Sequence, residues 1–162
     1  MPERIPLAIL PTPLHRLNHL SERLGINLWI KRDDLTGFAG GGNKGRKLEY
    51  LIAEALAQKA EVVVTCGSIQ SNFVRQLGAA CAMFGLNCVA AVMDLPFEFE
   101  RPSASAVGPM GGNVMLDDLF GVELRVFADD TWETLYGHAE SIARELEAEG
   151  KRVYRIPIGG SS

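Results

Sequence analysis

The chain has 162 residues, which is enough for one ordinary domain with its own hydrophobic core. Apolar residues make up 47% and charged residues 22%, proportions typical of a globular protein in water. The 20 acidic and 16 basic residues give a net charge of −4, which argues against a nucleic-acid-binding or acidic-membrane surface. No apolar run could span a bilayer and the chain start lacks a secretion signal, so we expect a cytoplasmic protein without a membrane partner.

The cysteine and histidine residues predict no metal site. Cys66, Cys81 and Cys88 lack the spacing of metal ligands, and their odd number does not indicate a disulfide framework. The three histidines are scattered along the chain. We therefore expect reduced, buried thiols and no bound metal.

The first sixty residues contain short elements and then a glycine-rich turn. Residues 11–25 read as a turn with a short helix, and residues 27–32 read as a strand. A polar pair, Asp33 and Asp34, follows this strand and precedes the three glycines at 40–42. The next helix is predicted to start immediately after these glycines.

Two lysines occupy what reads as the start of this helix. Lys44 and Lys47 lie where the helix macrodipole is positive, a poor place for cations. Lys44 is in line with Leu48 and Ala55 of the apolar stripe, whereas Arg46 points the opposite way. The glycines expose backbone N–H groups. An anionic ligand would accept hydrogen bonds from these groups and would neutralise the charge of the two lysines. The alternative is a pair of solvated lysines whose long stems reach water.

Short apolar runs alternate with amphipathic stretches after residue 60. Strands are predicted at 62–66, 88–93, 123–127 and 152–156, with helices at about 69–84, 113–120 and 131–149. Ser68 is the expected N-cap of the first of these helices. Asp130 and Glu133 resemble a capping box at the start of the last. The succession predicts an α/β fold with a small parallel sheet of about four strands sandwiched by helices.

Polar residues are concentrated where the first of these strands runs into its helix. Ser68, Gln70, Ser71 and Asn72 fall within five positions. Ligands of open parallel sheets bind beyond the carboxyl ends of the strands, and a helix start suits a substrate carboxylate. The alternative is an ordinary helix cap with solvated polar neighbours.

Four motifs, taken in order, resemble the D-cysteine desulfhydrase and 1-aminocyclopropane-1-carboxylate (ACC) deaminase family. They are residues 31–34, 41–49, 70–76 and 156–161. Members of this family are pyridoxal-phosphate enzymes with the tryptophan-synthase-β type of fold. The resemblance covers essentially the whole chain and implies pyridoxal 5′-phosphate as the cofactor and a small amino acid as the substrate.

The resemblance also implies roles for the matching residues. Lys44 corresponds to the lysine that binds the cofactor covalently, and Lys47 to a lysine that contacts its phosphate. Asn72 corresponds to the asparagine that binds the pyridine 3′-oxygen, and Ser71 to a serine beside the substrate that takes part in proton handling. Ser68, Gln70, Ser71 and Asn72 would together bind the substrate carboxylate.

The chain departs from the family at one residue and in its length. Phe73 stands where members usually carry a polar residue, and it fits the apolar stripe of its helix. Family members continue for a comparable length beyond residue 161. The resemblance therefore implies an amino-terminal portion: residues 1–46 from an incomplete larger α/β domain, 47–158 as a small α/β domain, and 159–162 returning to the larger one.

The resemblance favours a lyase or deaminase acting on D-cysteine, with ACC deaminase as the alternative. A function of another class is a non-catalytic α/β module that binds a small anion or a partner chain. The expected partner is a second copy of the full-length chain or a complementing carboxyl-terminal half. The early residues are expected to expose apolar surface where that partner is missing.

Overall fold

A computed structural model describes residues 4–93, 112–127 and 131–160. Its centre is a four-stranded parallel sheet in the order β5–β4–β3–β6. The strands are β3 (Val62–Ser68), β4 (Asn87–Met93), β5 (Val122–Val126) and β6 (Val153–Arg155). The central pair, β3 and β4, is almost wholly buried, which explains why both read as continuous apolar runs.

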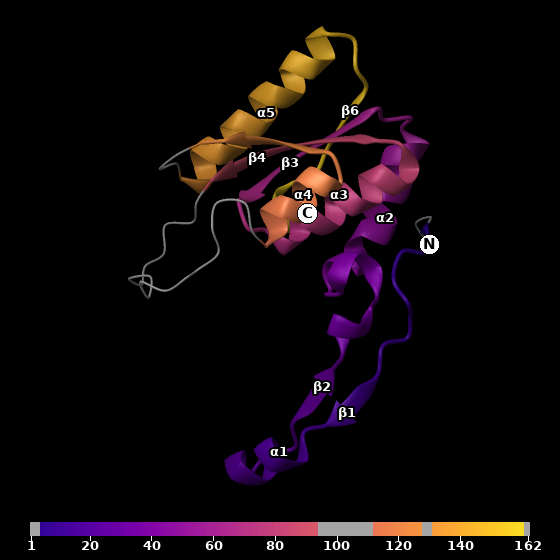
Figure 1. Ribbon diagram of the computed structural model, residues 1–162, viewed down its shortest axis with the longest axis vertical. Coiled ribbons are helices and arrows are strands. Elements are labelled where there is room, and N and C mark those ends of the chain that lie inside the picture. The colour runs from indigo at the N-terminus through magenta and orange to yellow at the C-terminus, as the bar shows by residue number, and fades with distance from the viewer. Residues whose placement is uncertain (1–3, 94–111, 128–130, 161–162) are drawn as a thin grey trace.

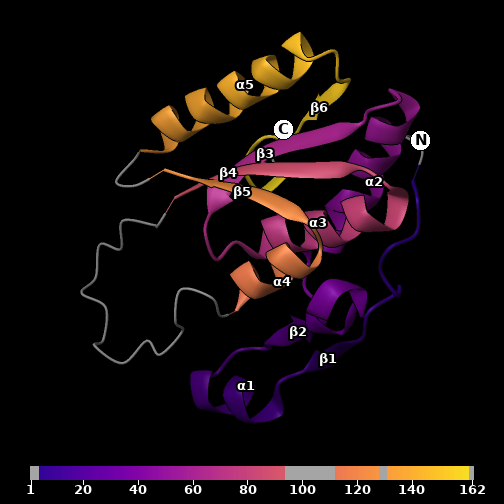
Figure 2. The ribbon, with the colours of Figure 1, turned by 45° about the horizontal axis from the view of Figure 1, so that its top comes forward.

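Helices cover both faces of this sheet, which confirms the predicted α/β class. Helices α2 (Lys44–Ala57), α3 (Asn72–Phe84) and α4 (Asn113–Leu119) lie on one side, and α5 (Trp132–Ala148) lies on the other (Figure 2). Each side has its own core: Leu48 and Leu77 belong to the first, and Leu135 and Ile142 to the second. Phe73 is buried in the first core with Leu77, as its register with the apolar stripe predicts.

Residues 9–35 extend away from the sheet as an arm (Figure 1). Strands β1 (Leu14–Arg16) and β2 (Trp29–Lys31) pair antiparallel around helix α1 (Asn18–Leu24). The arm exposes large apolar side chains, as expected: Ile9, Leu14, Leu20, Leu24, Ile26, Trp29 and Leu35. Within the described ranges, no helix combines the length and apolar character needed to cross a membrane.

The predicted cap of α3 is wrong by three residues. Ser68 is the last residue of β3, and the backbone N–H of Ile69 still donates to the Met93 carbonyl at 2.9 Å. Ser71 is the N-cap instead, because its backbone is extended and its hydroxyl accepts from the N–H groups of Phe73 and Val74 at 3.2 and 3.3 Å. The polar segment is therefore a loop between strand and helix rather than a first helical turn.

The predicted capping box of α5 is also wrong in its residues. Thr131 is the N-cap and exchanges hydrogen bonds with Thr134, three positions later. Asp130 lies outside the described residues. The threonine pair bonds free N–H groups of the first turn in the way that the predicted Asp–Glu pair would. It does so one position further along the chain, so the helix starts one residue later.

Helix α3 approaches the sheet closely at Gly78. A Cβ atom placed there would lie 2.3 Å from Cγ2 of Val122 in β5. Gly137, in the middle of α5, has no atom within 4 Å of the same position. The two helical glycines thus differ in the space around them: one is needed for packing, and the other leaves open room.

We expect Gly78→Ala to lower the free energy of unfolding by about 1–3 kcal/mol, because the added methyl group would force α3 away from β5. The matched control, Gly137→Ala, should raise it by about 0.5–1 kcal/mol, because alanine is the better helix former. Urea unfolding of both variants measures the difference. Equal effects of the same sign would contradict the packing described here.

Candidate functional site

Helix α2 begins at Lys44, as the sequence predicts, and its first turn contributes lysines but no carboxylate of its own. Asn43 occupies the N-cap position without a side-chain cap bond, and the first turn contains no acidic residue. Lys44 is half-buried, while Leu48 and Ala55 on the same stripe are fully buried. The electrostatic conditions for an anionic ligand are therefore present at this helix end.

The three lysines of this region differ in their partners. Lys31 Nζ donates to the carbonyl of Thr12, and Lys47 Nζ donates to the carbonyl of Gly159 at 2.7 Å. Lys44 has no hydrogen bond or ion pair with any described residue. Lys44 is consequently the lysine of this region whose amine is available to react.

The glycine run reaches α2 through a conformation that requires glycine. Gly41 has φ +79°, and a Cβ atom there would lie 2.1 Å from the backbone oxygen of Asp34. The next N–H, that of Gly42, donates to the Asp33 carbonyl at 2.8 Å. The buried Thr36 hydroxyl donates to the Gly42 carbonyl at 3.0 Å. The run is thus held against the preceding 3-10 turn, Asp33–Leu35.

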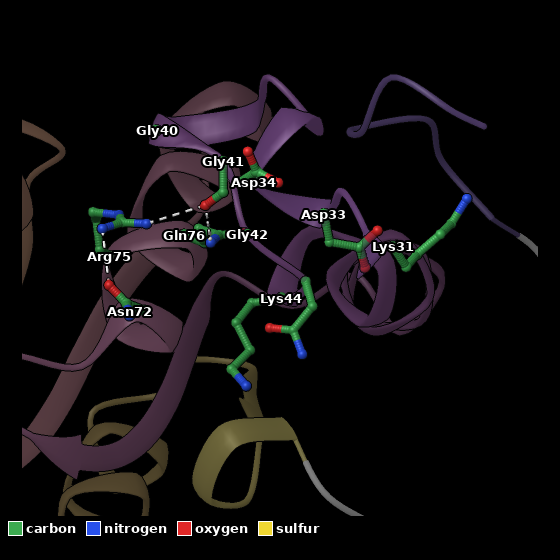
Figure 3. A pocket seen from close by; sticks show the side chains of 11 residues that line it. Lys31, Asp33, Asp34, Gly40, Gly41, Gly42, Lys44, Asn72, Arg75 and Gln76 are labelled. Carbon is green, nitrogen blue, oxygen red and sulfur yellow. Dashed lines mark hydrogen bonds between the residues drawn. The ribbon is translucent and has the colours of Figure 1, made fainter. Parts of the chain in front are cut away.

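The Gly41 carbonyl joins the glycine run to α3. It accepts from Gln76 Nε2 at 2.9 Å and from Arg75 Nη2 at 3.3 Å (Figure 3). Gln76 is fully buried, and its Oε1 has no hydrogen-bond partner among the described residues. A side-chain amide inside the apolar face of a helix is costly unless it is bonded, so Gln76 has a specific role in holding this junction.

A second junction fixes α2 to the arm. Arg46 donates from Nε and Nη2 to the two carboxylate oxygens of Asp33, at 2.8 and 2.7 Å. The Thr12 hydroxyl donates to the same carboxylate at 2.8 Å. Together the guanidinium and the hydroxyl lower the pKa of Asp33 to about 2. Arg46 therefore points away from the apolar stripe, as predicted, and is paired rather than solvated.

These segments surround an open cavity of about 490 Å³, a size typical of small-molecule sites. Its lining comes from the end of β2, the glycine run, and the first turns of α2 and α3 (Figure 3). The lining residues are Lys31, Asp33, Asp34, Gly40, Gly41, Gly42, Asn43, Lys44, Asn72, Arg75 and Gln76.

The cavity brings together two of the predicted site residues, Lys44 and Asn72, although they are 28 positions apart. Ser68, Gln70, Ser71 and Lys47 do not line it.

The predicted site residues that do not line the cavity are used structurally. Ser71 caps α3, and the Gln70 side-chain oxygen accepts from the Asn113 N–H at 2.9 Å. Ser68 is half-buried at the end of β3. Lys47 contacts the 3-10 turn Ile158–Gly160 through its bond to Gly159. Their roles toward a ligand stay predictions.

Sequence reasoning assigned no role to Arg75, Gln76 and Asn113. The sequence pattern could have indicated a role for Gln76, because it is a polar residue on the helix face that is otherwise apolar toward the core. No sequence pattern indicated a role for Asn113, because its bonds to Gln70 and Asn72 link positions more than forty residues apart.

Asp117 in α4 is fully buried, and neither carboxylate oxygen has a hydrogen-bond partner among the described residues. Loss of hydration raises the pKa of Asp117 to about 7, although the nearby positive charge of Arg75 opposes the shift. The three thiols are buried and not in disulfides, as expected. Burial raises the pKa of Cys66 to about 11, so it is not an activated nucleophile.

We expect Gly41→Ala to cost about 3 kcal/mol or more of folding stability, because the methyl group would meet the Asp34 backbone. Gly25→Ala is the matched control: Gly25 also has positive φ, +65°, but no atom lies within 4 Å of the added carbon. Its cost should be about 1–2 kcal/mol. Chemical denaturation compares the two, and equal costs would show that the close approach at Gly41 is unimportant.

We expect Asp117 to make stability depend on pH. Its folded-state pKa lies above the unfolded value, so its contribution becomes more unfavourable as the pH rises from about 4 to about 7. Asp117→Asn should therefore gain about 2 kcal/mol relative to the unmodified chain between pH 5 and pH 8. Asp118→Asn changes the exposed neighbour and should show no such gain. Parallel stability profiles for all three proteins would contradict the prediction.

Comparison with known proteins identifies the family. The model of the family described as "Pyridoxal-phosphate dependent enzyme" matches residues 5–162. The chain belongs to this family. Pyridoxal phosphate is the family's cofactor, as the motifs predicted.

Several individual proteins are similar to the chain. D-cysteine desulfhydrases of Salmonella paratyphi B and Salmonella enteritidis PT4 are each 42% identical over 98% of it. A crystal structure of an ACC deaminase homologue superposes with a TM-score of 0.84 at 40% identity, covering 99% of the chain. O-ureido-L-serine synthase, at 20% identity and a TM-score of 0.61, shares the fold. The chain spans about half the length of these relatives: 46% of the desulfhydrases and of the homologue structure.

Proposed function

We propose that the chain carries the lysine-bearing part of a pyridoxal-phosphate-dependent lyase that acts on D-cysteine. The reaction takes D-cysteine and water to pyruvate, hydrogen sulfide and ammonia. The observation that carries the proposal is the state of Lys44: it lines the cavity at a positive helix end without a partner among the described residues, while Lys31 and Lys47 are bonded elsewhere. The relatives named D-cysteine desulfhydrase support the substrate.

The chain's own residues fit an anionic cofactor. The start of α2 offers backbone N–H groups and two lysines without a nearby acidic residue on the same turn. Lys44 would hold the cofactor aldehyde, Asn72 would bind the ring oxygen, and Lys47 would lie on the phosphate side.

The cofactor supplies an electron sink for the charge that develops at the substrate α-carbon. The protein must then orient the substrate and move protons. We assign removal of the α-proton to Lys44 Nζ, since this amine lines the cavity and has no partner among the described residues. The Ser71 hydroxyl accepts from two backbone N–H groups, so its own hydrogen remains to donate to a substrate oxygen. Sulfide leaves from the β-carbon, and water completes the reaction.

We expect pyridoxal phosphate to give a new absorbance band that is lost in Lys44→Ala. Borohydride reduction followed by peptide mapping should place the cofactor on Lys44, because its amine is not engaged by the protein. Lys151→Ala, which removes an exposed lysine far along the chain, is the control and should keep the band. A cofactor attached to Lys47 or Lys31 would contradict the assignment.

Substrate assays separate the remaining functions. Release of sulfide and pyruvate from D-cysteine by full-length protein supports the proposal, whereas ammonia release from 1-aminocyclopropane-1-carboxylate alone would favour the ACC deaminase alternative raised by the similar structure. If pyridoxal phosphate binds without any lysine adduct or turnover, the non-catalytic anion-binding module is the better description. We expect the 162 residues alone to be weakly active or inactive.

We also propose that the arm belongs to a larger domain and is covered in the working protein. Leu14, Leu24, Ile26 and Trp29 are each more than half exposed, which is unusual for a patch of large apolar side chains. On the resemblance to the family, residues 1–46 would belong to the larger domain, 47–158 would form the small domain, and 159–162 would return to the larger one. A complementing half, or a second copy of the full-length chain, would supply the missing contacts.

A further inference from the structure

Arg75 lies in the first turn of α3 and connects three separate segments. Its Nη1 donates to Asn72 Oδ1 at 3.0 Å and to Asn113 Oδ1 at 2.7 Å, and its Nη2 donates to the Gly41 carbonyl at 3.3 Å. The same guanidinium thus contacts the glycine run before α2 and the start of α3 (Figure 3), and through Asn113 it also contacts the start of α4. A lysine could not reproduce this, since only the planar guanidinium presents several donors in fixed directions.

The bonds of Arg75 determine which end of the Asn72 amide faces the cavity. Asn72 Oδ1 accepts from Arg75 Nη1 and from Asn113 Nδ2, the latter at 3.1 Å. These two donors occupy both lone pairs of the oxygen. Asn72 Nδ2 has no partner among the described residues, and Asn72 lines the cavity. The amide therefore presents a donor to whatever the cavity binds.

Helix α4 places a buried carboxyl group within electrostatic reach of Arg75. Asp117 follows Asn113 by one helical turn, so both lie on the α4 face that packs on α3. Asp117 is fully buried without a hydrogen bond, and Arg75 Nε is also buried and unpartnered within the described ranges. The positive charge of Arg75 acts on the Asp117 carboxyl group across this interface and partly opposes the rise in its pKa that burial causes.

We propose that Arg75 is a positioning residue that sets the orientation of the Asn72 amide, so that its Nδ2 group donates to an acceptor atom of the bound ligand. In the cofactor site proposed above, that acceptor would be the ring oxygen, and this part of the inference rests on the proposed function. Because Asn72 Nδ2 faces the cavity, the chain's own residues favour a ligand that places an acceptor atom, and not a donor, beside Asn72. Asn113 shares the role, because it provides the second donor to Asn72 Oδ1.

The first test does not need the cofactor. In the ¹⁵N-labelled chain, the Asn72 side-chain amide signals are identified by their disappearance in Asn72→Asp. We expect a rigid amide in the unmodified chain, and in Arg75→Met a changed chemical shift with an order parameter that falls from roughly 0.85 to below about 0.6. Asn113→Ala should change the same signals in the same direction. Arg144→Met, on the exposed surface of α5, should leave them unchanged.

The second test uses pyridoxal phosphate as the ligand and the Lys44-dependent absorbance band as the measure. We expect Arg75→Met to weaken the binding of pyridoxal phosphate at least tenfold, Arg75→Lys to weaken it by a similar amount, and Arg144→Met to have no effect. Circular dichroism checks folding, and Arg75→Lys and Asn113→Ala decide the question if Arg75→Met does not fold.

Two outcomes would overturn the inference. One is an Asn72 amide with unchanged signals in both Arg75→Lys and Asn113→Ala. The other is normal binding of pyridoxal phosphate in folded Arg75 variants, which would make Arg75 a purely structural link. Failure of the unmodified chain to form any Lys44-dependent band would count against the proposed function instead, and the Asn72 signals would still test the positioning of the amide.

Discussion

The Gly41 carbonyl is the point on which the site depends. It accepts from Arg75 and Gln76 of α3, and it can reach them only because Gly41 adopts a positive φ and passes within contact of the Asp34 backbone. This junction places the start of α2 beside the start of α3. Lys44 and Asn72 share a cavity for that reason, although among the described residues no hydrogen bond joins their two side chains.

The charged groups around this junction are not equivalent. Asp33 is paired with Arg46 and bonded to Thr12, so it remains ionised far into the acid range and anchors α2 to the arm. Asp117 is buried without hydrogen bonds and costs stability when it is charged. The electrostatic effect of Arg75, which lines the cavity, offsets part of that cost.

Much of the fold was predictable from local pattern. Continuous apolar runs predicted β3 and β4, and the spacing of apolar residues predicted α2 and α5. Their alternation along the chain predicted a parallel sheet with helices on both faces. The caps were predicted less well, because Ser68 and Ser71 are chemically alike. Only the extended pairing of β3 with β4 up to Met93 decided that the helix starts at the second serine.

The sequence by itself determined the sheet, the start of α2 at Lys44 and, through its ordered motifs, the pyridoxal-phosphate family. These features depend on residues close together in the chain or on motifs read in order. The tertiary structure decided which lysine is unengaged, which residues line the cavity and which way the Asn72 amide points. Those properties depend on contacts between residues far apart in the chain, such as Arg75 with Gly41 and Asn113 with Asn72, and no local pattern specifies them.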